Sequence, residues 1–349
     1  MKKLSKLMAV VLAVAMVLAL AACGSTGGTA SGSAAPAASG SGAASGSGSA
    51  APAGDGQTYK IGICQLVQHE ALDAANQGFQ DALTEKLGDA VKFDDQNASG
   101  DSANCSTIVN GFVSDGDDLI LAIATSPLQA AAAATADIPV LGTAVTDYAT
   151  ALEISDWSGT VGTNVSGTSD LAPLDQQADM LHDLFPDAKN VGLLYCSAEP
   201  NSVYQCTVIE GYLKELGYNV TWYAFNDTND VTSVTETAAD NSDVIYIPTE
   251  NTAASNTEAI ANVVLAKKVP VIAGEEGIAR GCGVAALSIS YYDLGYQTGL
   301  MAYDILANGA DVSTMAVQTA PSVTKKYNAA NAEALGITIP DDYEAIAEN

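Results

Sequence analysis

Apolar strand patterns alternate with helical patterns along most of this chain. The clearest unit starts with a continuous apolar run over residues 119–124, typical of a parallel strand covered on both faces. A polar turn follows, and then an alanine-rich helical segment and a second apolar strand. In the turn, Thr125 and Ser126 supply capping hydroxyls and Pro127 stands at the first helical position. This predicts an accessible helix N-terminus at the carboxyl edge of a sheet, where open α/β folds bind ligands.

The same unit returns about one hundred and thirty positions later. Ile61 and Val191 open matching strands 130 positions apart, and the strands at Pro139 and Pro270 are 131 apart. The repeat predicts an α/β fold of two Rossmann-like lobes, each with a parallel sheet and with its carboxyl-edge loops facing the other lobe.

The order of elements predicts how the chain is shared between the lobes. Lobe 1 is expected to contain residues 58–167 and 289–314, and lobe 2 residues 168–288 and 315–349. Strands expected near 160–169, 284–290 and 315–318 would cross between them. Three crossing strands form a hinge that bends without breaking either core.

The first 22 residues have the pattern of an export signal. Three lysines precede an apolar run over residues 7–22, which is shorter than the roughly 20 residues of a membrane-spanning helix. The motif Leu20-Ala-Ala-Cys23 follows and resembles the lipobox of bacterial lipoproteins. The resemblance implies cleavage before Cys23, lipid attachment at Cys23, and a position on the outer face of the cell membrane.

Residues 24–56 consist almost entirely of Gly, Ser, Ala, Thr and Pro, with no charged residue before Asp55. Such a composition is typical of a flexible linker, and as a random coil it would span roughly 30 Å. We therefore expect residues 23–57 to tether a globular head to the lipid.

The chain is strongly acidic, with a net charge of −28. Without the three signal lysines, 10 basic residues remain against 41 acidic ones, a net charge near −31. A charge of this sign excludes nucleic acid as a partner, because phosphates are recognised by positive surfaces.

The cysteines and histidines indicate no metal site and no cofactor. Five cysteines remain after Cys23, and a Cys196–Cys206 disulfide and buried free thiols are both open alternatives. The two histidines, His69 and His182, are far apart in sequence, and no Cys-x-x-Cys motif is present.

Several motifs together carry a family resemblance. They include Ile61-Gly-Ile-Cys-Gln-Leu66, Thr143-Ala-Val-Thr-Asp147, Pro248-Thr-Glu-Asn-Thr252 and Tyr291-Tyr-Asp-Leu-Gly-Tyr-Gln-Thr-Gly299. In register over essentially residues 58–349, the chain resembles the ABC-transporter substrate-binding proteins of the tryptophan/tyrosine-binding type, which have the type I periplasmic-binding-protein fold. The resemblance implies capture of a small amino-acid-like solute and its delivery to a permease powered by an ATPase. The chain departs from many relatives at Ser290, where they have Asp.

The candidate ligand contacts lie on loops that follow predicted strands. They are Gln65, His69, Glu70, Thr125, Ser126, Thr146, Asp147, Tyr195, Glu199, Asn201, Ser202, Asn251, Glu275 and Tyr291. Hydroxyls and amides at helix starts suit a ligand carboxylate, and the acidic residues suit an ammonium group. Gln65, His69 and Glu70 would form a lid over the ligand.

An aromatic ligand would find ring partners in Tyr195 and Tyr291, since ring pairs add about 0.5–1.5 kcal/mol beyond area burial. For each candidate an ordinary alternative stays open: Ser126 as a helix cap only, and any one acidic residue as a solvated surface charge. On these residues tyrosine or tryptophan is the expected ligand.

Enzyme, sensor and adhesin functions are alternatives to transport. The sequence has no Gly-x-Ser-x-Gly elbow, phosphate loop or metal cluster, so we do not expect an enzyme. A cell-surface sensor or adhesin with the same fold is an alternative, as is an importer component for a nucleoside or a branched-chain amino acid.

Overall fold

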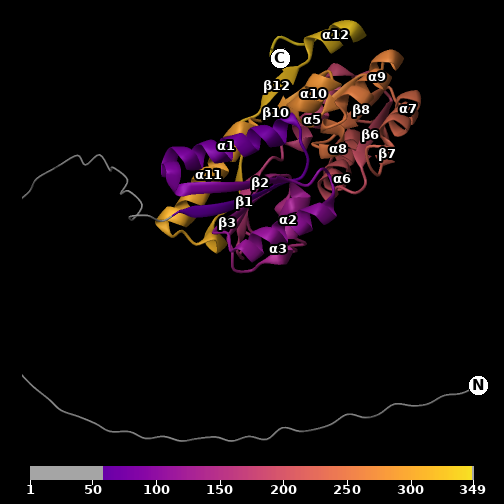
Figure 1. Ribbon diagram of the computed structural model, residues 1–349. Coiled ribbons are helices and arrows are strands. Elements are labelled where there is room, and N and C mark those ends of the chain that lie inside the picture. The colour runs from indigo at the N-terminus through magenta and orange to yellow at the C-terminus, as the bar shows by residue number, and fades with distance from the viewer. Residues whose placement is uncertain (1–57, 348–349) are drawn as a thin grey trace, which may run out of the picture. The chain divides into compact units, whose positions relative to one another are not determined.

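A computed structural model describes residues 58–347 of the chain, and these residues form two β-sheets flanked by helices (Figure 1). The predicted signal segment, Cys23 and the predicted linker lie outside the described residues. In the first sheet the strand order is β11-β5-β4-β3-β1-β2, with every neighbouring pair parallel. Its strands are β1 (Tyr59–Gln65), β2 (Val91–Asn97), β3 (Leu119–Ile123), β4 (Val140–Val145), β5 (Val165–Ser169) and β11 (Gln318–Thr319).

The second sheet has the order β13-β12-β10-β9-β8-β6-β7, in which β10-β9-β8-β6-β7 repeats the order β5-β4-β3-β1-β2 of the first sheet. Its strands are β6 (Asn190–Cys196), β7 (Asn219–Phe225), β8 (Val244–Ile247), β9 (Val271–Ala273), β10 (Ala285–Ser288), β12 (Thr324–Tyr327) and β13 (Glu344–Ala345). Only β12 pairs antiparallel, with β10. The sequence repeat is thus a repeat of topology, and the predicted α/β fold with two sheets is confirmed.

The helices divide between the two sheets, and each sheet with its helices is called a lobe below. Lobe 1 carries α1 (Glu70–Leu87), α2 (Ser102–Asp115), α3 (Thr125–Ala134), α4 (Tyr148–Ala151) and α11 (Tyr291–Asn308), with short 3₁₀ turns at Gly88–Ala90 and Val312–Thr314. Lobe 2 carries α5 (Leu174–Leu184), α6 (Pro200–Glu215), α7 (Val231–Asn241), α8 (Asn251–Ala254), α9 (Thr257–Lys267), α10 (Glu276–Gly281) and α12 (Ala329–Leu335). Among the described helices, none combines the length and the apolar character needed to cross a bilayer.

Each sheet is buried on both faces, as its apolar sequence predicts. All five residues of β3 are buried in one core cluster of lobe 1. Two core clusters, containing Ile245 and Tyr246 respectively, cover the opposite faces of the lobe 2 sheet. Successive side chains of a strand point to opposite faces, so a strand between two helical layers must be apolar throughout.

Helices α1 and α11, from opposite ends of the described chain, lie side by side (Figure 1). Glycines make this close approach possible, because a methyl group at Gly295 would collide with the carbonyl of Ala75, and one at Gly78 with the carbonyl of Tyr292. The N-terminal end of α11, with Tyr291, is thereby fixed relative to α1 and the cleft.

The chain passes between the sheets at three places: residues 170–173, 289–290 and 320–323. The sequence expected the third passage at residue 315. Strand β11 at Gln318–Thr319 pairs with β5 in the first sheet, so the passage follows residue 319. Strand pairing decides this boundary, and a two-residue strand leaves little periodicity in the sequence.

The structure also tests the predicted cap of α3 and the two alternatives for the cysteines. Neither Thr125 nor Ser126 is the N-cap of α3; that position is Ala124, with φ 87°, and no side chain caps the helix. The predicted cap was therefore wrong. The five cysteines of the described residues are all buried free thiols, so Cys196 and Cys206 do not form a disulfide.

Candidate functional site

The loops at the carboxyl ends of the two sheets face one another across a cavity of about 340 Å³. Lobe 1 contributes the loops after β1, β2 and β3, and lobe 2 the loops after β6, β7 and β8. The lining is mostly polar: Leu66, Val67, Ser99, Gly100, Ser102, Ser126, Cys196, Ala198, Glu199, Asn226, Asp227, Thr228, Asn229, Asn251, Thr252 and Ser255. Ligands of α/β folds bind at such carboxyl edges, because helix N-termini point there.

On the lobe 1 side the cavity is bordered by the start of α3. Ser126 lines it, and Thr125 beside Ser126 is buried. Without a side-chain cap, the first backbone N–H groups of α3 remain available to a ligand oxygen. Ala124 has a backbone conformation that non-glycine residues rarely adopt, and such strain is concentrated at binding sites.

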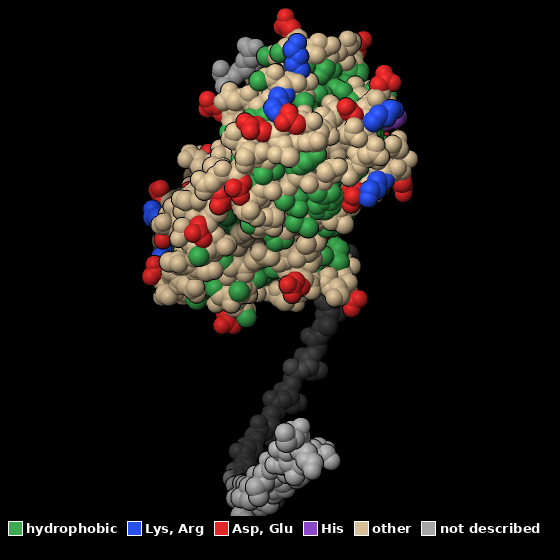
Figure 2. Space-filling view, turned by 90° about the vertical axis from the view of Figure 1, so that its right-hand side faces the viewer, with side chains coloured by type: hydrophobic (Ala, Val, Ile, Leu, Met, Phe, Trp, Pro, Cys, Tyr) green, Lys and Arg blue, Asp and Glu red, His purple; other side chains and the backbone are tan. Residues whose placement is uncertain are grey.

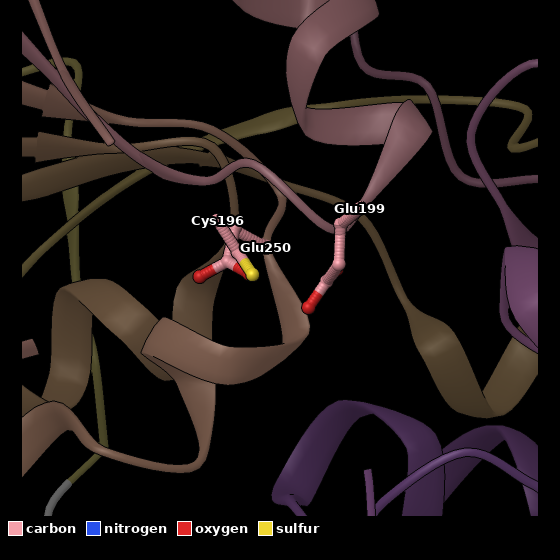
Figure 3. A group of neighbouring side chains, drawn as sticks. All are labelled: Cys196, Glu199 and Glu250. Carbon is pink, nitrogen blue, oxygen red and sulfur yellow. The ribbon is translucent and has the colours of Figure 1, made fainter. Parts of the chain in front are cut away.

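On the lobe 2 side two glutamates and a cysteine converge: Cys196, Glu199 and Glu250 (Figure 3). Glu199 accepts hydrogen bonds from the Asn251 amide side chain at 2.7 Å and from the Thr252 backbone N–H and hydroxyl at 3.0 and 2.9 Å. Glu250 accepts from the backbone N–H groups of Thr252 and Ala253 and so caps α8.

The two glutamates share one negative charge. Burial and the neighbouring Glu199 charge raise the pKa of Glu250 well above its ordinary range, so Glu250 is protonated. Burial alone would raise the pKa of Glu199, but hydrogen bonds from Glu250, Asn251 and Thr252 lower it. Although the oxygens and the Cys196 sulfur lie within 4.8 Å of one another, as in a metal site, hydrogen bonds already occupy the two carboxyl groups.

A second acidic pair, Asp170 and Glu275, lies where the two lobes meet nearer the crossing strands. Asp170 follows β5 and is 3% exposed, and its Oδ2 accepts a hydrogen bond from the Tyr291 hydroxyl at 2.9 Å. Glu275, also 3% exposed, caps α10 by accepting from the backbone N–H groups of Gly277 and Ile278 at 2.7 and 2.6 Å. Burial raises the pKa of Asp170 to about 6 and that of Glu275 to about 7.

Two contacts between the lobes come from the start of α1. The His69 ring Nε2 lies 3.2 Å from the Asn251 Oδ1, and the Glu70 carboxylate forms an ion pair with Arg280 at 3.0 Å. Burial lowers the pKa of His69, so the ring is neutral near pH 7. The described conformation therefore holds the lobes in contact.

The structure brings nine of the fourteen predicted site residues to this cleft. Ser126, Glu199 and Asn251 line the cavity of 340 Å³, and His69, Glu70, Glu275 and Tyr291 border two smaller cavities of about 290 and 200 Å³. Thr125 lies beside Ser126, and Asn201 donates to the carbonyl of Thr249 at 3.3 Å and to Glu199 at 3.4 Å.

The other five predicted residues have partners within their own lobe. Tyr195 packs edge-on against Trp222 in the lobe 2 core, with ring centroids 5.2 Å apart. The Gln65 side chain donates to Asp73, and Asp147 caps α4. Thr146 and Ser202 are buried. The backbone carbonyl of Thr146 accepts a hydrogen bond from Ser169 and its side chain acts on Asp170, while the Ser202 hydroxyl accepts from Asn201.

The sequence reasoning missed Asp170 and Glu250. Each stood close behind a recognisable strand, at the carboxyl edge where candidates were sought. That position was the available signal, but nothing in the sequence distinguished these two from the other 39 acidic residues. Ser290, where many relatives have Asp, is exposed and caps α11 by accepting from the Asp293 backbone N–H at 3.1 Å. Aspartate serves equally well at such a position.

Comparison with known proteins gives consistent matches. A family model described as ABC transporter substrate binding protein matches residues 60–349. A tyrosine-binding protein of Clostridioides difficile is 38% identical over 262 residues, which are 74% of this chain and 75% of the relative.

Two solved structures bear on the conformation. An ABC domain in complex with L-Trp from Streptococcus pneumonia is 34% identical with a TM-score of 0.78, covering 82% of this chain and 97% of its own. The ligand-free, open structure of a substrate-binding protein with adhesive properties from Clostridium difficile is 37% identical, with a TM-score of 0.64. The match covers 84% of this chain and 100% of that one. Despite its lower sequence identity, the complex is the better structural match.

Proposed function

The chain belongs to the family of ABC transporter substrate-binding proteins with the type I periplasmic-binding-protein fold, and from this premise we propose its ligand. We propose that it captures an aromatic α-amino acid, tyrosine or tryptophan, between its lobes and delivers it to a membrane permease driven by an ATPase. A ligand that touches both lobes favours the closed state by its differential affinity for that state.

The observation that carries this proposal is the conformation. With the lobes in contact through His69 and Glu70, the protein matches the relative that holds L-Trp better than the open, ligand-free one. The 38% identity to a tyrosine-binding protein supports the same ligand class.

The cleft chemistry agrees with a zwitterion. The start of α3, with Thr125 and Ser126, offers N–H groups and hydroxyls to a carboxylate, and buried acids in lobes 1 and 2 offer partners for an ammonium group. Burying an aromatic ring of roughly 150–200 Å² contributes about 4–5 kcal/mol before ordering costs. Because polar contacts are nearly matched by water, ring burial should decide which amino acid binds.

Calorimetry with the mature protein tests the ligand. We expect L-tyrosine or L-tryptophan to bind more tightly than leucine, isoleucine, valine or any nucleoside. Binding of nucleosides or branched-chain amino acids, with tyrosine and tryptophan ignored, would show that the ligand assignment is wrong while leaving family membership intact. Ser126→Ala should weaken all amino-acid ligands by a similar factor.

We also propose that Cys23 carries a lipid and that residues 24–57 tether the head to the outer face of the membrane. The acidic side chains are scattered over the face shown in Figure 2 rather than gathered in one patch, as expected if they keep a tethered protein soluble. Cys23→Ala should release the protein or leave the signal uncleaved. Normal processing together with unchanged membrane retention would contradict the anchor.

Adhesion is a second candidate function, favoured by one finding. The Clostridium difficile relative at 37% identity is described as having adhesive properties. Cells that display this chain should then attach to a host-cell layer better than cells that display the Cys23→Ala variant. Attachment should not require the amino-acid ligand.

A further inference from the structure

One oxygen of a buried carboxylate at the carboxyl edge of β5 has no hydrogen-bond partner among the described residues. Asp170 is 3% exposed; its Oδ2 accepts from Tyr291 and the neighbouring Thr146 side chain also acts on the carboxyl group, but its Oδ1 has no hydrogen-bond partner there. Buried polar atoms are almost always satisfied, and an unsatisfied carboxylate oxygen is more costly than a neutral one. The unpartnered oxygen therefore points to a donor that the protein chain does not provide.

Asp170 lies in a group of polar residues drawn from both lobes. The Tyr291 hydroxyl, at the start of α11, contacts Asp170 and the side chain of Thr249, which follows β8 in lobe 2. The Asp170 charge also acts on Glu275, and both carboxyl groups act on Tyr291, so the three lie close together. Glu275 and Tyr291 line the same cavity of about 200 Å³.

Neither carboxyl group is compensated by a cation. Within residues 58–347, no lysine, arginine or histidine forms an ion pair with Asp170 or Glu275. Arg280, which lines a cavity together with Glu275, pairs with Glu70 and Glu276. Two buried acids without a positive partner are unfavourable unless something positive joins them.

We propose that Asp170 and Glu275 receive the ammonium group of the ligand, with Tyr291 as the residue that positions Asp170. The inference rests on the proposed function and assigns one end of the ligand within that site. The ammonium donates to the Asp170 Oδ1 and compensates the charge of both carboxylates. Because Asp170 belongs to lobe 1 and Glu275 to lobe 2, the cation joins the lobes directly. Glu199, by contrast, already has its donors from Asn251 and Thr252.

The arrangement couples binding to proton release. Below about pH 6 the free protein holds protons on both carboxyls, whose pKa values are about 6 and about 7, and the ammonium displaces them. The titratable groups that interact with Asp170 and Glu275 are Tyr291, Tyr148 and Glu70, besides the two carboxyls themselves. Burial raises the pKa of both tyrosines far above neutrality, so neither titrates in this range. Affinity should therefore increase as the pH rises from 5 to 8.

The test is calorimetry on the mature protein with L-tyrosine, L-tryptophan and the desamino analogue of each. Asp170→Asn and Glu275→Gln should each weaken the amino acids roughly 30-fold or more. The same variants should change the affinity of the desamino analogues by less than about threefold, because those lack the ammonium. Asp175→Asn, which removes the same charge from an exposed position on α5, is the matched control and should change neither.

Two further readouts separate a ligand contact from a structural role, and the first needs no variant. In buffers of different ionisation enthalpy, the apparent binding heat of the amino acids should differ in proportion to the protons released, and that of the desamino analogues should not. Tyr291→Phe should weaken the amino acids less than Asp170→Asn, and should shift the pH profile of their binding, because it removes one donor from Asp170.

Equal losses for amino acids and desamino analogues would show a structural role and overturn the inference, as would binding without proton release. If the wild-type protein binds neither amino acid, the proposed ligand is wrong. The cation site is then tested by the pH dependence of unfolding of the ligand-free protein. A ligand-free protein whose unfolding temperature does not fall between pH 5 and 8 more steeply than that of Asp170→Asn would overturn the cation site as well.

Discussion

Two pairs of buried carboxyl groups lie at the carboxyl edges of the two sheets, and they differ in where their hydrogen-bond donors come from. Glu199 and Glu250 are surrounded by donors of their own lobe, including the Asn251 side chain and the Thr252 N–H and hydroxyl. Asp170 and Glu275 belong to different lobes, and one Asp170 oxygen has no donor among the described residues. The first pair is complete within the protein. In the second pair Glu275 accepts from Gly277 and Ile278, but within residues 58–347 the Asp170 Oδ1 is left without a donor.

The difference shows that burial and charge alone do not identify a ligand contact. All four residues are at most 6% exposed. Glu199 has a lowered pKa because donors compensate its burial, whereas burial raises the pKa of Asp170 and Glu275. Unsatisfied oxygens, rather than acidity, distinguish the candidate site from a structural cluster. The predictions below test that distinction, from the largest expected effect to the smallest.

Glu199→Ala should destabilise lobe 2 by about 3–5 kcal/mol, because it leaves the buried donors of Asn251 and Thr252 without an acceptor. Urea unfolding followed by circular dichroism measures this loss. Glu215→Ala, at the exposed end of α6, is the control and should change stability by less than about 0.5 kcal/mol. A loss of similar size from both variants would remove the contrast between the pairs.

Asp170 and Glu275 should make the ligand-free protein less stable as the pH rises, in the same direction as Glu250, whose pKa is also raised. A carboxyl whose pKa is raised by folding, from 3.8 to about 6 in Asp170 and from 4.5 to about 7 in Glu275, binds its proton more tightly when folded. Stability is then greatest below the ordinary pKa and is lost as the pH rises through the folded one, by about 2–3 kcal/mol for each group.

Unfolding free energies at pH 4, 6 and 8 measure this fall. The double variant Asp170→Asn with Glu275→Gln should show a flatter profile than the wild type, whereas Glu199→Gln should retain the contribution of the second pair. A wild-type protein that gains stability between pH 5 and 8 would contradict the raised pKa values.

His69→Ala removes the hydrogen bond between α1 and Asn251, the direct contact of lobe 1 with the first pair. Its contribution to closure should be about 1 kcal/mol, or roughly a fivefold loss of ligand affinity. His182→Ala is the matched control, since His182 contacts Tyr218 within lobe 2 and should leave affinity unchanged. If both variants lose affinity equally, the effect is one of stability and not of closure.

Glu70→Gln should have the smallest effect. The Glu70–Arg280 pair is 3.0 Å long but half-exposed, and such pairs contribute about 0–1 kcal/mol. We expect a loss of ligand affinity of at most about threefold at low salt, which disappears at high salt. Because the Glu70 charge raises the pKa of Glu275, this variant should also move the pH profile of binding to slightly lower pH. An effect independent of salt would rule out a Coulombic role.

The sequence by itself determined the fold. A strand buried on both faces must be apolar throughout, so runs such as β3 were visible, and the repeat from Ile61 to Val191 predicted two lobes of one design. It also located the carboxyl-edge loops, and with them Ser126, Glu199, Asn251, Glu275 and Tyr291. The local pattern was sufficient there because strands, turns and helices are each determined by residues that are close together in the sequence.

Only the tertiary structure decided which of these residues are free to act on a ligand. The donors that satisfy Glu199 lie 52 residues away at Asn251, and the hydroxyl that holds Asp170 lies 121 residues away at Tyr291. Tyr195 was expected at the ligand but packs against Trp222 in the core of lobe 2. Successive side chains of a strand point to opposite faces of the sheet, and the sequence does not show which elements cover each face. Whether a buried charge is satisfied is a property of long-range neighbours, and no local pattern records them.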